Sequence, residues 1–99
     1  MKEKDINELA QEKMTRAGWQ FWFPPHSYGR ERDIFGVFDC VAILPTGFLF
    51  IQLTSIQHIS DREKKIMAWV KAKNVKLPAG GAEVWAWDPK TKKFTIRKC

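Results

Sequence analysis

The chain has 99 residues, enough for one domain with a modest core and too few for two domains. Its composition, 44% hydrophobic and 28% charged, is typical of a globular domain and excludes disorder over most of the length. Seventeen Lys and Arg against eleven Asp and Glu give a net charge of +6, which favours an anionic partner such as nucleic acid.

Apolar runs and cysteines narrow the class of protein further. No apolar run approaches the ~18 residues of a membrane span, and the charged start of the chain does not resemble a signal peptide. Cys40 and Cys99 are too few for a disulfide framework or a zinc site. We therefore expect a cytoplasmic protein in a reducing compartment, with no membrane partner.

The first third of the chain predicts a helix and a short strand. Apolar residues at helical spacing predict the helix from Ile6 to Ala17, with Asp5 and Glu8 forming a capping box at its start. The aromatic stretch from Trp19 to Phe23 predicts a strand that two prolines end. A polar, basic loop follows.

The middle of the chain predicts a hairpin. Two apolar strands, from Val37 to Leu44 and from Phe48 to Thr54, flank the turn Pro45-Thr46-Gly47. Both faces of the hairpin are apolar, which predicts a central place in a sheet that is covered on both sides.

The last third predicts a second helix and two further strands. Ser60 and Glu63 form a capping box before a helix from Asp61 to Lys73, and strands run from Ala82 to Trp87 and from Lys93 to Arg97. The order αβββαββ over residues 1–99 predicts a single α/β domain, with a mixed sheet flanked by two helices.

Two polar residues interrupt the apolar hairpin strands, Asp39 in the first and Gln52 in the second. A buried carboxylate is costly unless it is hydrogen-bonded, paired or bound to a metal. Two interpretations of Asp39 therefore stay open: a structural residue that accepts backbone hydrogen bonds near a strand end, and a functional ligand.

The hairpin register decides whether these polar residues meet. If Leu44 faces Leu49, then Asp39 opposes Thr54, and Gln52 is its diagonal neighbour on the same face. A register shifted by one residue places Asp39 opposite a leucine instead and splits the cluster, unless a bulge intervenes. We expect the clustered arrangement, because burying polar residues together costs less than burying them separately.

This order of elements and its motifs resemble the PD-(D/E)XK nuclease superfamily, and within it the small Holliday-junction-resolvase-like and phage-type members. The match lies in residues 32–39 (RDIFGVFD), in residues 51–55 (IQLTS), and in Arg62 with Lys65 of the second helix. The resemblance implies a restriction-endonuclease-like core. It further implies a DNA endonuclease that hydrolyses phosphodiesters with Mg²⁺ or Mn²⁺, with branched DNA as one candidate substrate.

The resemblance also implies roles for individual residues. Asp39, the side-chain oxygen of Gln52 and the backbone carbonyl of Leu53 would bind the metal, since oxygen ligands suit such hard cations. Gln52 stands where the family usually has Glu, and Thr54 stands where it has Lys. Arg62, on the inward stripe of the second helix, is the candidate to supply the missing positive charge.

The second carboxylate of the site is left open. By its spacing from Gly18, the first-helix Glu of the family falls near Asn7 or Glu8, and Asp33 is a further candidate. Glu8 also fits a simple capping role. Asp33 also fits an ion pair within its own basic loop.

Partners follow from charge and from exposed aromatic residues. Lysines and arginines contact phosphates without reading sequence, and the candidate DNA contacts are Arg30, Arg32, Lys64 and Lys65. We also expect a homodimer through a strand face that carries Trp85 and Trp87. Gln52 and Thr54 favour a second interpretation, a catalytically impaired DNA-binding module of the same fold. A third is an interaction protein whose basic charge is incidental.

Overall fold

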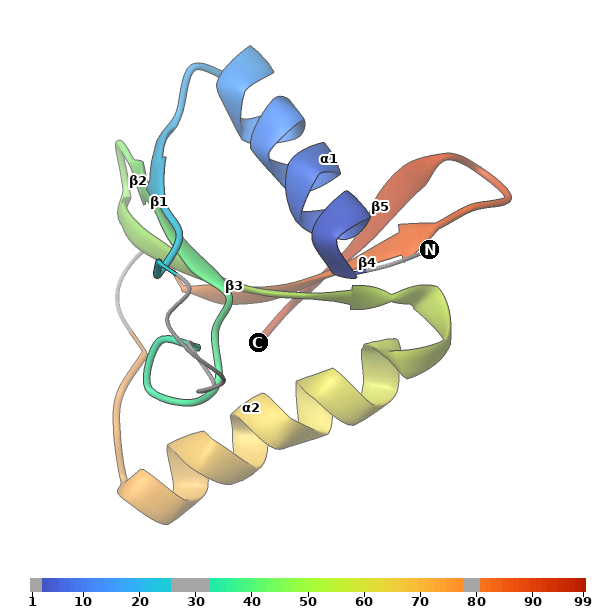
Figure 1. Ribbon diagram of the computed structural model, residues 1–99. Helices are drawn as coiled ribbons and strands as arrows, with labels where there is room; N and C mark the ends of the chain where they lie inside the picture. The colour runs from blue at the N-terminus through green and yellow to red at the C-terminus, as the bar shows by residue number, and fades with distance from the viewer. Residues whose placement is uncertain (1–2, 26–32, 78–80) are drawn as a thin grey trace.

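The computed structural model describes residues 3–25, 33–77 and 81–99. Its elements follow the predicted αβββαββ order, which confirms an α/β arrangement with a mixed sheet and two helices (Figure 1). In chain order they are α1 (Glu3–Arg16), β1 (Gln20–Trp22), β2 (Cys40–Leu44), β3 (Gly47–Ser55), the 3₁₀ turn η1 (Ile56–His58), α2 (Ile59–Lys73), β4 (Ala82–Asp88) and β5 (Lys93–Lys98).

The five strands form one sheet whose spatial order is the sequence order, β1-β2-β3-β4-β5. The first three strands form an antiparallel meander, β4 is parallel to β3, and β5 returns antiparallel to β4. Parallel neighbours need a long crossover, and η1 with α2 supplies it. The hairpin strand β3 is therefore central, as its apolar faces predict.

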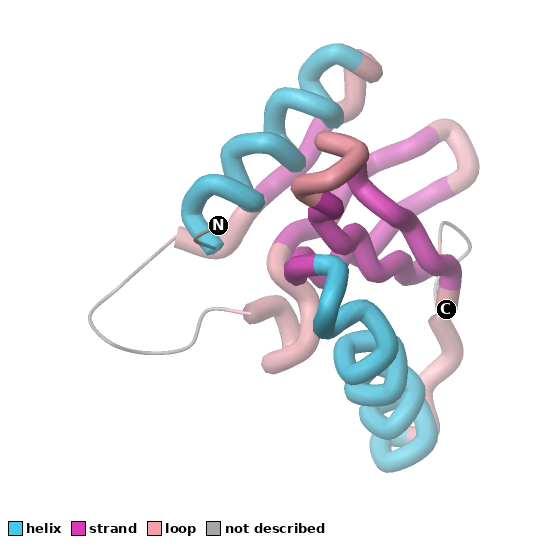
Figure 2. Tube along the Cα trace, turned by 90° about the vertical axis from the view of Figure 1, so that its right-hand side faces the viewer, coloured by secondary structure: helices cyan, strands magenta, loops and turns pink. Residues whose placement is uncertain are grey.

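The two helices lie on opposite faces of this sheet (Figures 1 and 2). Side chains alternate between the faces of a strand, so Leu49, Ile51 and Leu53 of β3 pack with α1, while Phe50 packs with the cluster of α2. The predicted cover on both sides of the hairpin is confirmed.

Both predicted capping boxes are wrong, because both helices begin earlier. α1 already starts at Glu3. α2 starts at Ile59, and its N-cap, His58, makes no side-chain capping hydrogen bond. The chain leaves β3 through η1 directly into the helix, so the burial of Ile59 rather than a capping side chain fixes where α2 begins.

The predicted hairpin register is also wrong. Leu44 pairs with Gly47, not with Leu49, so only Pro45 and Thr46 lie in the loop. Gly47 has a φ of 129°, a backbone conformation that favours glycine. A two-residue loop can therefore close the hairpin, and continuing this register places Asp39 opposite Gln52.

The strand face that we expected to form a dimer interface is covered by α1. Trp85 has no solvent exposure, and its ring lies 6.0 Å from that of Trp19 and 5.6 Å from that of Phe94. Its indole N–H donates to Glu83 Oε1 at 2.9 Å. Trp85 is a core residue, so this predicted interface is wrong, and the homodimer itself stays a prediction.

Within the described part of the chain, no helix has both the length and the apolar character to cross a membrane.

Candidate functional site

Asp39 and Gln52 meet in the structure, as the sequence predicts. Gln52 Nε2 donates to Asp39 Oδ2 at 2.9 Å and also to the carbonyl oxygen of Leu53 at 3.2 Å. Both side chains are buried, Asp39 with 9% and Gln52 with 4% of its surface exposed. Thr54 is buried two residues further along the same face of β3. The predicted metal ligands Asp39, Gln52 and Leu53 are therefore brought together.

The backbone around Asp39 explains how its carboxylate reaches this point. β2 begins at Cys40, and the Asp39 N–H donates to the Ile51 carbonyl at 2.8 Å. Its Oδ2 accepts the Leu53 N–H at 2.6 Å. The carboxylate thus extends the hydrogen bonding between β2 and β3 beyond the start of β2. This is the structural role left open above, and it holds the carboxylate beside Gln52.

The Gln52 amide decides what this cluster can bind. Its Nε2 faces two oxygens, while its Oε1 is buried with no hydrogen-bond partner in the described part of the chain. A half-turn of the amide would exchange the two atoms and turn Oε1 toward Asp39 Oδ2 and the Leu53 carbonyl. Three oxygens would then face one point, which suits a hard cation and is unfavourable without one. With the amide turned in this way, one carboxylate and two neutral oxygens would be the ligands available to Mg²⁺ or Mn²⁺.

The structure does not bring Glu8 to this cluster. Glu8 is exposed on α1, and α1 packs on the opposite face of the sheet from Gln52. Its neighbour Asn7 turns inward, and Asn7 Oδ1 is buried without a hydrogen-bond partner in the described residues. The cause is helical phase, because Ile6 and Ala10 define the buried side of α1 and Glu8 points away from it.

Asp33, the other candidate carboxylate, is partly exposed in the turn before β2. Over residues 3–25, 33–77 and 81–99, no three His, Cys, Asp or Glu side chains gather to hold a metal ion. The candidate site of the described chain is therefore built on Asp39 and neutral oxygens.

The predicted cations lie in different environments. Arg62 is in the first turn of α2, partly buried, with its Nε buried and without a partner among the described residues. Lys64 is exposed and Lys65 is partly buried on the same helix. Arg30 and Arg32 lie outside the described residues.

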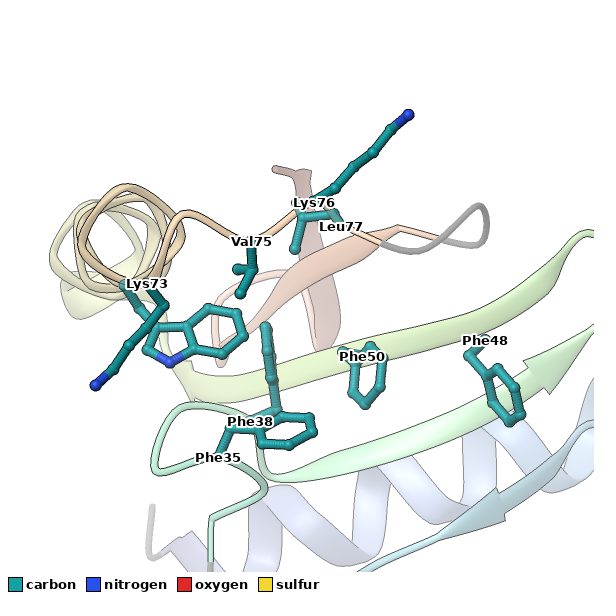
Figure 3. A pocket seen from close by; sticks show the side chains of 9 residues that line it. Phe35, Phe38, Phe48, Phe50, Lys73, Val75, Lys76 and Leu77 are labelled. Carbon is teal, nitrogen blue, oxygen red and sulfur yellow. The ribbon is translucent and has the colours of Figure 1, made fainter.

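A large apolar pocket, which the sequence analysis did not identify, lies on the α2 side of the sheet. We call it the aromatic pocket. It encloses about 790 Å³, and nine described residues line it: five aromatic, two aliphatic and two lysine. The aromatic lining consists of Phe35, Phe38, Phe48, Phe50 and Trp69. Figure 3 shows Phe38, Phe48 and Phe50 beside the hairpin strands, with Val75 reaching in from the segment after α2.

Two turns build the wall of the aromatic pocket. Phe35 and Gly36 both have positive φ, 57° and 72°, in a turn closed by the Val37 N–H donating to the Ile34 carbonyl. This turn places Phe35 against Trp69, with ring centroids 5.9 Å apart and planes at 23°. At the end of α2, Asn74 has a left-handed conformation, and the chain turns there so that Val75 lines the pocket.

The aromatic pocket and the Asp39–Gln52 pair are neighbours. Phe38 directly precedes Asp39, and Phe50 precedes Gln52 by two residues on the same face of β3. The alternation of Phe48, Phe50 and Gln52 is visible in the sequence. The approach of Trp69 and Phe35 is not, because it depends on how α2 crosses the sheet.

Both cysteines are free thiols. Burial, together with the negative charge of Asp39, raises the pKa of the Cys40 thiol far above its ordinary value. Burial, and then the carboxylates of Glu63 and Glu83, also raise the pKa of Cys99. Neither thiol is thus an activated nucleophile at neutral pH.

Comparison with protein-family models, with curated proteins and with solved structures found no match to this chain. A function for the domain therefore rests on its own fold and on the geometry of its site.

Proposed function

We propose that this domain is a metal-dependent DNA endonuclease that hydrolyses phosphodiester bonds. The observation that carries the proposal is the meeting of the Asp39 carboxylate, the Gln52 amide and the Leu53 carbonyl at one point. A bound Mg²⁺ or Mn²⁺ would supply an activated water and would neutralise charge on the scissile phosphate.

The fold supports this proposal. Its support is a mixed sheet with a meander of three antiparallel strands, a crossover helix, a fourth strand parallel to the third and one helix on each face, which is compatible with the core that the resemblance implies. Asp39 stands just before β2 and Gln52 within β3, where the two strands are held together. This placement fits the family motif.

The residues around the metal position have distinct tasks. The Leu53 N–H fixes Asp39 Oδ2, so the carboxylate is held in place before any ligand arrives. Arg62, in the first turn of α2, offers the permanent positive charge that the Thr54 side chain does not have. The net charge of +6 attracts DNA by contacts to phosphates.

A second candidate is a DNA-binding module of the same fold without catalysis. It is favoured by the present direction of the Gln52 amide. Nε2 donates to both Asp39 Oδ2 and the Leu53 carbonyl and so satisfies the oxygens that a metal would otherwise need. In this candidate the cluster only stabilises the end of β2.

Incubation with a labelled four-way junction and a matched duplex, in Mg²⁺, Mn²⁺ or EDTA, separates the two candidates. We expect cleavage with metal and none with EDTA. Asp39→Asn should lower the rate by at least about 10²-fold and leave binding in EDTA nearly unchanged, because it removes no cation. Binding should weaken steeply with salt. The slope of the logarithm of the binding constant against the logarithm of the salt concentration should become more negative by about 0.9 for each phosphate contact.

Asp88→Asn is the matched control. Asp88, the last residue of β4, also accepts a backbone N–H, from Lys90 at 2.9 Å in the turn that leads to β5. Cleavage that survives Asp39→Asn would belong to a contaminant or to another site. A parent protein that binds DNA but never cleaves it would establish the second candidate, and no salt-sensitive binding at all would refute both.

A further inference from the structure

We infer that the aromatic pocket binds an unpaired base of the DNA strand, so that the preferred substrate contains unpaired nucleotides rather than continuous duplex. This inference rests on the proposed function for the identity of the ligand, DNA. It adds a second contact site, separate from the Asp39–Gln52 pair.

The shape and lining of the pocket suit a flat aromatic ligand. Its volume of about 790 Å³ lies in the range of small-molecule sites. Phe35 is 68% exposed and Phe48 is 53% exposed, so both rings present free surface on which a base can stack. Stacking on aromatic side chains is the usual way in which proteins hold single-stranded bases, because every base has a π-face.

The backbone conformation that exposes the Phe35 ring is unfavourable, which argues that this exposure is not incidental. A phenylalanine at a φ of 57° adopts a conformation that is unfavourable for a bulky residue. The contacts with Trp69 and with Phe50, at 5.9 and 6.1 Å between ring centroids, fix the ring at the pocket wall. The exposed ring is therefore positioned before any ligand binds.

Charge selects a nucleotide over a neutral apolar ligand. Lys73 and Lys76 are the charged members of the described lining, and no acidic residue is among them. Figure 3 shows the amino groups of both lysines extending away from the rings. A base among the rings and its phosphate near an amino group outside them match a nucleotide, which carries both chemistries on one molecule.

The position along β3 connects this pocket to the proposed catalytic site. Phe48, Phe50 and Gln52 are every second residue of β3 and lie on one face of the strand. Successive members of this row are about 6.8 Å apart along the strand. A strand whose base stacks in the pocket can therefore run along β3 toward Asp39. The geometry points to DNA with a flap, a gap or an opened junction as the substrate class.

Fluorescence anisotropy in EDTA tests this without any need for cleavage. The probes are a labelled oligothymidine single strand and a labelled blunt two-strand duplex with the same number of phosphates, at one salt concentration. We expect tighter binding to the single strand. Phe35→Leu and Phe48→Leu, which keep apolar bulk and remove the ring, should each weaken single-strand binding on the order of 10-fold and duplex binding less than about 2-fold. Ile96→Leu, at an apolar residue of β5 that is 40% exposed, is the control and should change neither.

Three outcomes would overturn the inference: no preference for the single strand, equal losses on both probes, or light scattering that shows an oligomer which Phe35→Leu dissolves. The last would mean that a second copy of the chain fills the pocket. If the parent protein never cleaves but the ring variants lose single-strand binding selectively, the nuclease proposal fails and the pocket assignment stands.

Discussion

The two faces of the sheet differ in how completely they are packed. On the α1 face, Ala10, Met14 and Trp85 have no solvent exposure, and the rings of Trp19 and Phe94 pack against Trp85. On the α2 face, the buried Asp39–Gln52 pair lies beside a pocket whose rings Phe35 and Phe48 are largely exposed. One sheet thus provides a closed core on one side and an incompletely covered surface with polar chemistry on the other.

Side-chain size explains part of this difference. α2 packs through Ile59 and Ile66 onto Val84 and Ala86 of β4. Small strand residues allow the helix to lie close to β4. The surface of the hairpin around Phe48 is left largely exposed. A face whose packing is incomplete can hold a ligand without first unfolding, so we expect stability to reside mainly with α1 and binding with α2.

The largest effect on stability is expected for a truncation on the closed face. Met14→Ala should lower the free energy of unfolding by about 2–5 kcal/mol, because it leaves a cavity under α1. Phe48→Ala, on the open face, should lower it by only about 1 kcal/mol, because half of this side chain is already exposed. Urea denaturation of both variants measures the contrast, and similar losses would mean that the two faces do not differ as described.

Gln52→Glu tests the polar cluster of the α2 face. Glutamate removes the Nε2 donor that serves Asp39 and Leu53 and puts a second carboxylate beside Asp39. Without metal at pH 7, the free energy of unfolding should fall by about 2–3 kcal/mol. If the proposed metal position is correct, added Mg²⁺ should restore most of this loss, since the cation would neutralise the two adjacent carboxylates.

Thermal melts with and without Mg²⁺ measure this effect. Gln57→Glu, at an exposed position of η1, adds the same charge away from Asp39 and is the control. It should show little loss and no rescue. A Gln52→Glu protein that is destabilised but gains nothing from Mg²⁺ or Mn²⁺ would contradict a metal position at this cluster.

Alkaline pH should weaken the closed face through Cys40. The raised pKa keeps this thiol protonated in the native state, whereas the unfolded thiol loses its proton above pH ~8.5. The contribution of the Cys40 thiol to the free energy of unfolding is therefore complete below pH ~8.5. Above that pH, this contribution falls by at most about 1.4 kcal/mol per pH unit. Cys40→Ala should reduce the steepness of the decline in denaturation series from pH 8 to 10, leaving the smaller share of Cys99. Identical slopes for parent and variant would disprove the assignment.

The smallest effect is expected at the wall of the aromatic pocket. Phe35→Gly relieves the positive φ of this position, worth about 1–2 kcal/mol. It also removes ring contacts worth about 0.5–1.5 kcal/mol and increases the freedom of the unfolded chain. These terms nearly cancel, so calorimetry should find a change within about 1 kcal/mol. A larger loss would make Phe35 a core residue and weaken its assignment to ligand binding.

Sequence patterns predict the order of elements and the two-sided cover of β3, because helical and strand periodicities report burial directly. They also bring Asp39 and Gln52 together. They fail for the register, since the two-residue loop at Pro45 and Thr46 depends on the conformation of Gly47. They fail for Glu8 because it points away from the buried side of α1, and because α1 lies on the opposite face of the sheet from Gln52.

The aromatic pocket could not be predicted in the same way. Its rings come from the turn at Phe35, from the hairpin and from α2. Only the path of the crossover, together with the left-handed Asn74 at the end of α2, sets their distances. A function located between elements leaves a weaker trace in the sequence than one located within a strand pair.

The parallel pairing of β3 with β4 has a consequence for how the chain folds. Leu44 reaches Gly47 through a short turn, but Phe50 meets Ala82 only after the whole crossover has formed. Such non-local pairing forms slowly, because closing the long loop costs more conformational entropy than closing a hairpin. We expect the β1–β3 meander and the β4–β5 hairpin to form first and to join last along β3. Until then, the exposed edge of β3 could pair with another chain, so refolding yield should fall as protein concentration rises.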